Sequence, residues 1–147
     1  MSQVFPLQIL LDLSQNHLDE ATRRLGELVT GEQQAKQRLE MLVQYRSEYR
    51  TRFQEAARDG LDYGQLRNYQ SFLLRLDDAI AQASRLMEQA SLHTSTGRQE
   101  WLDRSSRVRA FDTLADHHKT KCQQAERRQE QKIQDGHAAR NTDKFDK

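Results

Sequence analysis

The fold of this chain is decided near its middle, by the stretch Arg58-Asp59-Gly60-Leu61-Asp62-Tyr63-Gly64. It is the only place in the 147 residues where two closely spaced glycines accompany two aspartates. Glycine adopts the left-handed backbone angles that end a helix, and aspartate is favoured in tight connections. The stretch therefore predicts a turn over residues 59–64 between two longer segments.

On both sides of this turn, apolar residues recur at steps that alternate between three and four residues. A mean spacing of about 3.5 residues is typical of helices that wind around one another with a left-handed supercoil. We call these positions the seam. Before the turn the seam comprises Leu7, Leu11, Leu18, Ala21, Leu25, Leu28, Ala35, Leu39, Leu42, Tyr49, Phe53 and Ala56. After the turn it comprises Leu66, Tyr69, Leu73, Leu76, Ile80, Ala83, Met87, Ala90, Trp101, Val108, Phe111 and Ala115.

The two halves of the seam match when the chain is folded back at the turn. With the turn at Gly60, Phe53 falls opposite Tyr69, and the small Ala21 falls opposite the large Trp101. Small residues opposite large ones fill space without leaving voids. The sequence therefore predicts an all-α fold, a long two-helix antiparallel coiled-coil hairpin.

The pattern also predicts the boundaries of the hairpin. We expect a first helix over about 6–58, a connection over 59–64 and a second helix over about 65–130, all within a single hairpin of residues 1–135. Residues 136–147 are polar and are expected to form a disordered tail.

The second helix has two features of its own. The stretch 91–97 is rich in residues that favour caps and turns, so we expect a soft or kinked segment there. The helix also extends beyond the first one: Leu7 pairs with Ala115, so the part after about His118 has no partner within the chain. Such an overhang is either a frayed tail or an arm that another protein receives.

The composition excludes several classes of protein. The 23 Lys and Arg residues balance 22 Asp and Glu residues, so there is no basic footprint for nucleic acid. The single cysteine allows no intramolecular disulfide and fits a reducing compartment. No apolar stretch approaches the roughly 20 residues that cross a bilayer, so we expect a soluble cytoplasmic protein. Carboxylates are scattered between arginines, and Asp77 and Asp78 are expected to face solvent.

One pair of residues has the spacing of a metal half-site. His118 and Cys122 are one helical turn apart, but a structural zinc site needs four ligands, and the more distant histidines are His17, His93 and His137. The sequence contains no glycine-rich phosphate loop and no nucleophile motif. We therefore expect no enzymatic activity, no metal and no cofactor.

A group of apolar and aromatic residues gathers near the turn, partly off the seam. Helical spacing aligns one row on each helix, and the antiparallel register brings the two rows together. We name this group the aromatic patch; it comprises Leu42, Tyr45, Tyr49, Phe72, Leu76 and Ala79. An exposed patch with aromatic residues is typical of a surface that binds a partner. The alternatives are a thicker core or self-association into a four-helix arrangement.

Two sequence elements that flank the turn carry a family resemblance. They are Tyr45-Arg46-Ser47-Glu48-Tyr49-Arg50 and Asn68-Tyr69-Gln70-Ser71-Phe72-Leu73. With these elements, the chain resembles the FliJ family of the bacterial flagellar type III export apparatus over most of its length. The resemblance implies a coiled coil similar to the gamma-subunit stalk of rotary ATPases, with a part in flagellum biogenesis, motility and chemotaxis.

The resemblance also implies partners. Members of the family insert the end that bears the chain termini into the hexameric ring of the export ATPase FliI. They contact the cytoplasmic domain of the export gate protein FlhA, and they bind export chaperones such as FlgN and FliT. The gate-binding residues of the family carry over to all six residues of the aromatic patch, whereas the flanking Arg38 and Ala83 differ from the family's residue types.

These implied contacts describe a non-enzymatic coupling factor at the inner face of the cell membrane at the flagellar base, reached through its partners. From the length mismatch between the helices, we expect the section from His118 onward to enter the ring. The alternative function is that of a generic structural coiled coil that self-associates.

Overall fold

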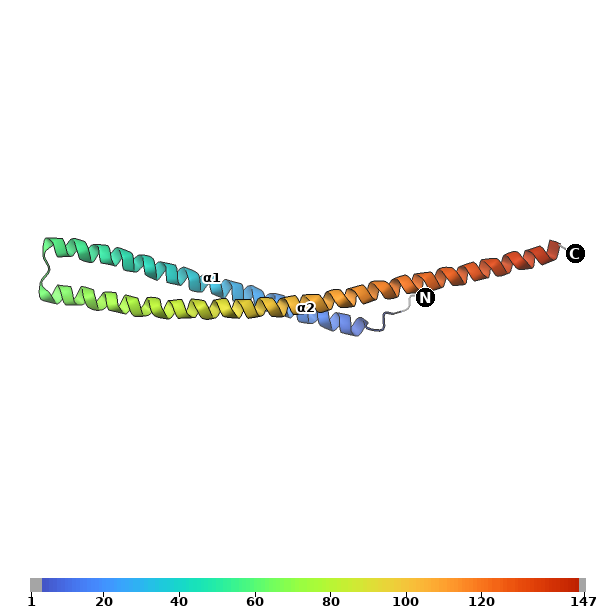
Figure 1. Ribbon diagram of the computed structural model, residues 1–147, viewed down its shortest axis with the longest axis horizontal. Coiled ribbons are helices and arrows are strands. Elements are labelled where there is room, and N and C mark those ends of the chain that lie inside the picture. The colour runs from blue at the N-terminus through green and yellow to red at the C-terminus, as the bar shows by residue number, and fades with distance from the viewer. Residues whose placement is uncertain (1–3, 146–147) are drawn as a thin grey trace. The chain divides into compact units, whose positions relative to one another are not determined.

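The computed structural model describes residues 4–145, with side chains through residue 143, and consists of two helices (Figure 1). α1 spans Gln8–Asp59 and α2 spans Tyr63–Phe145. The two helices run antiparallel from a short connection and pack against each other, so the predicted all-α hairpin is confirmed. Neither helix has an apolar window long enough to cross a bilayer within the described residues.

The contacts between residues divide the described chain into two units. Each unit contains one segment of α1 and one segment of α2. The turn unit is Glu20–Leu102 and contains the connection. The termini unit combines the described residues up to Asp19 with those from Asp103 onward. The single hairpin over residues 1–135 stays a prediction.

The connection forms because Gly60 ends α1 and Asp62 begins α2. Gly60 adopts φ +96°, in the left-handed region, and its N–H donates to the carbonyl of Ala57 at 3.4 Å. The carboxylate of Asp62 accepts the backbone N–H of Gln65 at 2.8 Å, and the side-chain oxygen of Gln65 accepts the N–H of Asp62 at 3.3 Å. This reciprocal capping box satisfies two N–H groups at the start of α2. The connection is therefore only residues 60–62.

Replacing Gly60 by alanine is expected to lower the free energy of unfolding by about 1 kcal/mol, because a Cβ is strained at positive φ. The midpoint of thermal unfolding, followed by circular dichroism, should fall by a few degrees. The control is Gly26→Ala, because Gly26 lies inside α1 with no heavy atom within 4 Å of its Cβ position. If Gly60→Ala unfolds at the same temperature as the unchanged chain, the positive φ of Gly60 has no structural role.

The seam residues are buried or half-buried in both units. In the turn unit Ala21, Leu76 and Ala83 are buried, while the half-buried positions include Leu25, Leu39, Phe53, Tyr69, Leu73, Ile80, Met87 and Trp101. In the termini unit Val108 is buried, and the half-buried positions include Leu11, Leu18 and Phe111. Half-burial is what a pair of helices can provide, since each seam residue stays open at the sides of the hairpin.

The stretch 91–97 is helical throughout, and its small and polar residues serve the packing. The hydroxyl of Thr94, a residue only 3% exposed, lies 3.0 Å from the carbonyl of Ala90 and 3.2 Å from the carbonyl of Leu28 on α1. A Cβ at Gly97 would lie 2.6 Å from Cδ1 of Leu28, so glycine permits a close approach of the helices. The predicted soft or kinked segment is therefore an uninterrupted part of α2.

The structure corrects the predicted end of the second helix. α2 continues past residue 130 to Phe145, so the predicted disordered tail is helical in its described part. The sequence from 131 to 145 contains no proline and several Gln, Lys, Arg and Ala residues, which favour helix. All side chains from 123 to 143 are exposed, and residues 146–147 lie outside the described residues.

Candidate partner-binding surface

The rings of the aromatic patch come together in the turn unit, where α1 and α2 face each other. Tyr49 and Phe72 form the centre, with ring centroids 4.5 Å apart. Tyr45 meets Phe72 edge to face, at a centroid distance of 6.2 Å and an interplanar angle of 86°. Leu42 and Ala79 line one groove beside these rings. Aromatic contacts of this geometry hold the rings in a defined orientation.

The patch is only partly covered by the hairpin itself. Leu76 is 6% exposed and forms its buried base, whereas Tyr45 is 41% exposed. The other members, Leu42, Tyr49, Phe72 and Ala79, are half-buried. A thicker core would cover Tyr45 as well, so this distribution favours a docking surface.

The patch presents a neutral face. Burial raises the pKa of Tyr49, and the neighbouring Tyr69 and Tyr45 raise it further, whereas Arg52 lowers it. A phenol is protonated at neutral pH even at its ordinary pKa, and the raised pKa of Tyr49 extends this neutral state to higher pH. A partner that covers this face therefore buries aromatic surface without having to desolvate a charge within the patch.

An ion pair between the helices lies at the edge of the patch. Arg46 on α1 pairs with Asp77 on α2, and both Asp77 and Asp78 are exposed. Sequence reasoning missed this pair. The sequence does contain a sign of this pair. Arg46 stands between Leu42 and Tyr49, at a place where the heptad spacing of the seam calls for an apolar residue, so a carboxylate on the facing helix can neutralise it.

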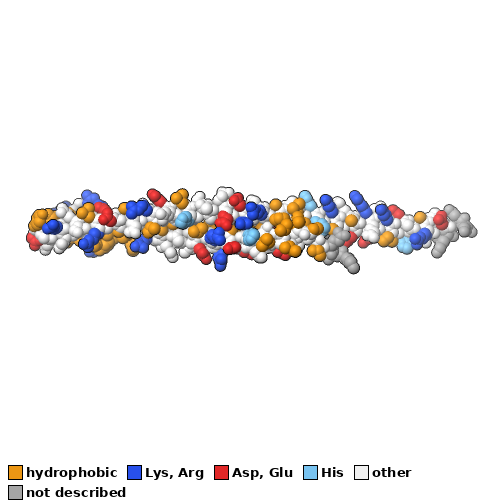
Figure 2. Space-filling view, turned by 90° about the horizontal axis from the view of Figure 1, so that it is seen from below, with side chains coloured by type: hydrophobic (Ala, Val, Ile, Leu, Met, Phe, Trp, Pro, Cys, Tyr) orange, Lys and Arg blue, Asp and Glu red, His pale blue; other side chains and the backbone are white. Residues whose placement is uncertain are grey.

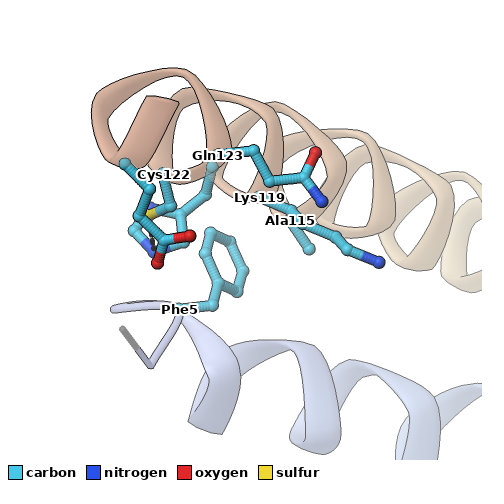
Figure 3. A pocket seen from close by; sticks show the side chains of 7 residues that line it. Phe5, Ala115, Lys119, Cys122 and Gln123 are labelled. Atoms are coloured by element: carbon cyan, nitrogen blue, oxygen red, sulfur yellow. Dashed lines mark hydrogen bonds between the residues drawn. The ribbon is translucent and has the colours of Figure 1, made fainter. Parts of the chain in front are cut away.

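The pair with the spacing of a metal half-site, His118 and Cys122, lies in the termini unit next to the ring of Phe5 (Figure 3). Sγ of Cys122 and Nε2 of His118 are 3.6 Å apart on α2. The ring of Phe5 points toward α2 and lies 5.6 Å from the imidazole of His118. Among the described residues, no group of three or more His, Cys, Asp and Glu side chains has a metal-binding arrangement. The pair is part of a packing contact, which sequence reasoning missed because Phe5 precedes the first seam residue.

The termini unit carries a second apolar surface, which sequence reasoning also missed. Ile9, Leu10 and Leu13 on α1 and Leu114 on α2 are 81%, 44%, 48% and 45% exposed. Figure 2 shows hydrophobic side chains gathered right of the centre, over the first turns of α1. Leu10, Leu13 and Leu114 line an open groove that Arg104 borders. The sequence feature that could have revealed this surface is a set of leucines next to seam positions, such as Leu10 beside Leu11 and Leu114 beside Ala115.

Comparison with known proteins gives consistent matches over nearly the whole chain. The sequence model of the family described as "Flagellar FliJ protein" matches residues 2–144. The chain is 34% identical over 140 residues to the flagellar FliJ protein of Salmonella typhi, covering 95% of each chain. It is 32% identical over 140 residues to the flagellar FliJ protein of Escherichia coli strain K12, again covering 95% of each.

Proposed function

The chain belongs to the flagellar FliJ protein family and has a role in flagellar protein export, and we propose that it works there as a stalk-like coupling factor without enzymatic activity. In this proposal the aromatic patch binds the cytoplasmic domain of the export gate protein FlhA. The end that bears the chain termini binds the ring of the export ATPase FliI. Export chaperones such as FlgN and FliT bind in turn, and the partners hold the chain at the inner face of the membrane at the flagellar base.

The gate contact is supported by the aromatic patch above all. Three rings from two helices are oriented by their mutual contacts, yet Tyr45 remains 41% exposed. Pre-oriented aromatic side chains lose little conformational entropy on binding, and such side chains often dominate the binding energy of an interface.

The ring contact is supported by the form of α2 in the termini unit. Side chains from 123 to 143 are exposed on every face of the helix, although the first part of the section, with Gln123 and Glu126, lines the pocket beside Phe5. A single uncovered helix fits the lumen of a hexameric ring, where it meets the ring's subunits on all sides. Acidic and basic residues are balanced in this section of α2. The section can therefore make polar contacts with the ring on all sides, without a strong electrostatic preference for one subunit.

In this proposal the chain acts through binding alone. Contact with the gate allows the proton-motive force to drive export efficiently, while the ATPase ring holds the other end of the stalk. A bound protein shifts the equilibrium of its partner only if it binds one state more tightly than the other. The aromatic patch would therefore bind the export-competent state of the gate more tightly.

The proposal is tested by pull-down of the purified chain against the gate domain and against the ATPase, with and without nucleotide. We expect both proteins to be retained, and the ATPase to be retained more strongly with nucleotide, which favours its ring. Retention of neither protein would refute the coupling function.

A self-associating structural coiled coil is the second candidate, favoured by the second apolar surface around Leu10 and Leu114. Sedimentation equilibrium separates the two functions. The coupling function predicts that Tyr45→Ala removes gate binding from a folded chain, whereas the structural function predicts an oligomer in solution whose mass falls when Leu10 is replaced by alanine.

A further inference from the structure

Polar contacts between the helices gather at the end of the turn unit that lies away from the connection. Nη1 of Arg24 donates to both carboxylate oxygens of Glu100, each at 3.1 Å. The indole N–H of Trp101 donates to the hydroxyl of Thr22 at 2.9 Å. We call this group the register lock; it comprises Thr22, Arg24, Leu28, Thr94, Glu100 and Trp101, where the hydroxyl of Thr94 lies 3.2 Å from the carbonyl of Leu28.

The seam alone permits more than one alignment of the two helices. Phe53 packs against Tyr69, with ring centroids 5.5 Å apart. If α2 slipped by seven residues, Phe53 would face Leu76 instead. Leu42 would then face Met87, so the facing residues would still be apolar. A pattern that repeats every seven residues therefore does not by itself determine the register.

The connection alone is a weak restraint on such a slip. The entropy cost of closing a loop grows only slowly with its length. The first turns of α2 can supply the extra residues, and Tyr63 at their start is 77% exposed. A slip would break the capping box of Asp62 and Gln65 and leave the seam matched. Contacts away from the connection are therefore needed to hold one register.

The register lock supplies such contacts, because its residues do not repeat along the helices. After a slip by seven residues Arg24 would face Arg107 or His93, according to the direction, and would lose its carboxylate partner. Leu28 would lose the space beside Gly97, where a Cβ would lie 2.6 Å from Cδ1 of this leucine. Single polar positions in a coiled coil fix its register in this way.

The aromatic patch exists in only one register, because its rings come from both helices. Phe72 on α2 packs against Tyr49 and Tyr45 on α1. After a slip by seven residues Phe72 would face Ala57 or Val43, and neither carries a ring. The patch therefore depends on the alignment of α1 with α2.

We infer that the register lock is a positioning element for the gate-binding surface. It holds α1 and α2 in the one register in which the rings of the aromatic patch meet. Roughly 33 Å of helix separates Thr94 from Phe72, so the lock acts without touching a partner bound at the patch. The inference rests on the proposed function for its partner, whereas the register can be measured on the chain alone.

A double substitution with a matched control tests the effect on binding. The lock variant combines Arg24→Glu with Thr94→Val, which reverses one charge of the ion pair and removes the buried hydroxyl. The control combines Arg23→Glu with Thr30→Val, since Arg23 is exposed and the hydroxyl of Thr30 donates to Gly26 within α1. We expect the lock variant to bind the purified gate domain at least fivefold more weakly in calorimetry, and the control to stay within twofold.

A third substitution tests whether the loss comes from the contact between the helices. Adding Glu100→Arg to the lock variant restores the ion pair with its charges exchanged. We expect this variant to recover at least half of the lost affinity, which removal of a surface charge alone would not allow. Circular dichroism of each variant establishes that the hairpin is intact.

Disulfide trapping measures the register directly. Leu39 lies opposite Ala83, counted along both helices from the contact of the rings at 53 and 69. A slip by seven residues would bring Leu39 opposite Ala90 or Leu76. Each pair is replaced by cysteines in a chain that carries Cys122→Ser. With the lock intact we expect a crosslink only between positions 39 and 83, whereas the lock variant should also crosslink one of the slipped pairs.

The outcomes separate this inference from the proposed function. If the lock variant crosslinks only positions 39 and 83, the connection alone sets the register and the inference is wrong, while gate binding that Tyr45→Ala removes still supports the proposed function. If the lock variant slips and binds the gate domain as tightly as the unchanged chain, the register does not position the surface and the inference is overturned. If the unchanged chain does not bind the gate domain, the proposed function fails and the inference falls with it.

Discussion

The double substitution of Tyr45 and Phe72 by alanine is expected to abolish binding of the export gate domain and to leave cells poorly motile. The two rings meet edge to face, and a buried aromatic anchor of an interface contributes about 2 kcal/mol or more. Loss of both anchors therefore weakens binding by a factor of roughly several hundred or more. Calorimetry with the purified gate domain measures the affinity, and swarming on soft agar measures motility.

Two exposed apolar residues provide the controls for this experiment. Tyr63 is 77% exposed and Leu74 is 65% exposed, and neither belongs to the aromatic patch. Their substitution by alanine removes comparable apolar surface from the same unit and should leave gate affinity within twofold. The account is contradicted if the double variant is folded by circular dichroism and still binds the gate domain as tightly as the unchanged chain.

Deletion of residues 123–147 is expected to weaken binding to the ATPase at least tenfold and to spare binding to the gate domain. The described side chains of this section are exposed, and Gln123 and Glu126 at its start line the pocket beside Phe5, so its removal takes away little of the packing of the hairpin. The removed helix is roughly 35 Å long at about 1.5 Å per residue, which is long enough to lie deep within a ring.

The chain offers no second segment of similar length that could be deleted as a control. The control is therefore the thermal stability of the shortened hairpin. Its thermal unfolding should match that of the full chain, because Phe5, His118 and Cys122 are all retained. Loss of gate binding with retained ATPase binding would reverse the assignment of the two ends.

The sequence was sufficient to predict the hairpin because its two strongest signals are local. The seven-residue period determines which face of each helix is covered, and Gly60 with Asp62 marks the only place where the chain can turn tightly. The positive φ of Gly60 and the capping box of Asp62 and Gln65 are the physical basis of that signal. The aromatic patch followed from the same register.

Features that depend on contact between distant residues were harder to predict. Thr94 and Gly97 weaken a helix in isolation, so the stretch 91–97 was expected to be soft. In the structure the same residues allow close approach to Leu28, and that packing outweighs their low helix propensity. The contact of Phe5 with His118 has no periodic signal at all, because Phe5 lies before α1.

The end of α2 was misjudged for a different reason. The sequence beyond residue 130 has no seam, and without a packing face it resembles a disordered tail. Its residues nevertheless favour helix and contain no proline, so the helix continues to Phe145. The polar composition beyond residue 130 predicts that the side chains are exposed. It does not distinguish an exposed helix from a disordered segment.

The measurement that tests the account most directly is whether one chain binds both partners at once. The chain, the gate domain and the ATPase with nucleotide should be mixed and separated by size-exclusion chromatography with light scattering. The account predicts a single complex that contains all three proteins, since the aromatic patch and the end of α2 are different surfaces. Competition, in which the ATPase displaces the gate domain from the chain, would contradict it.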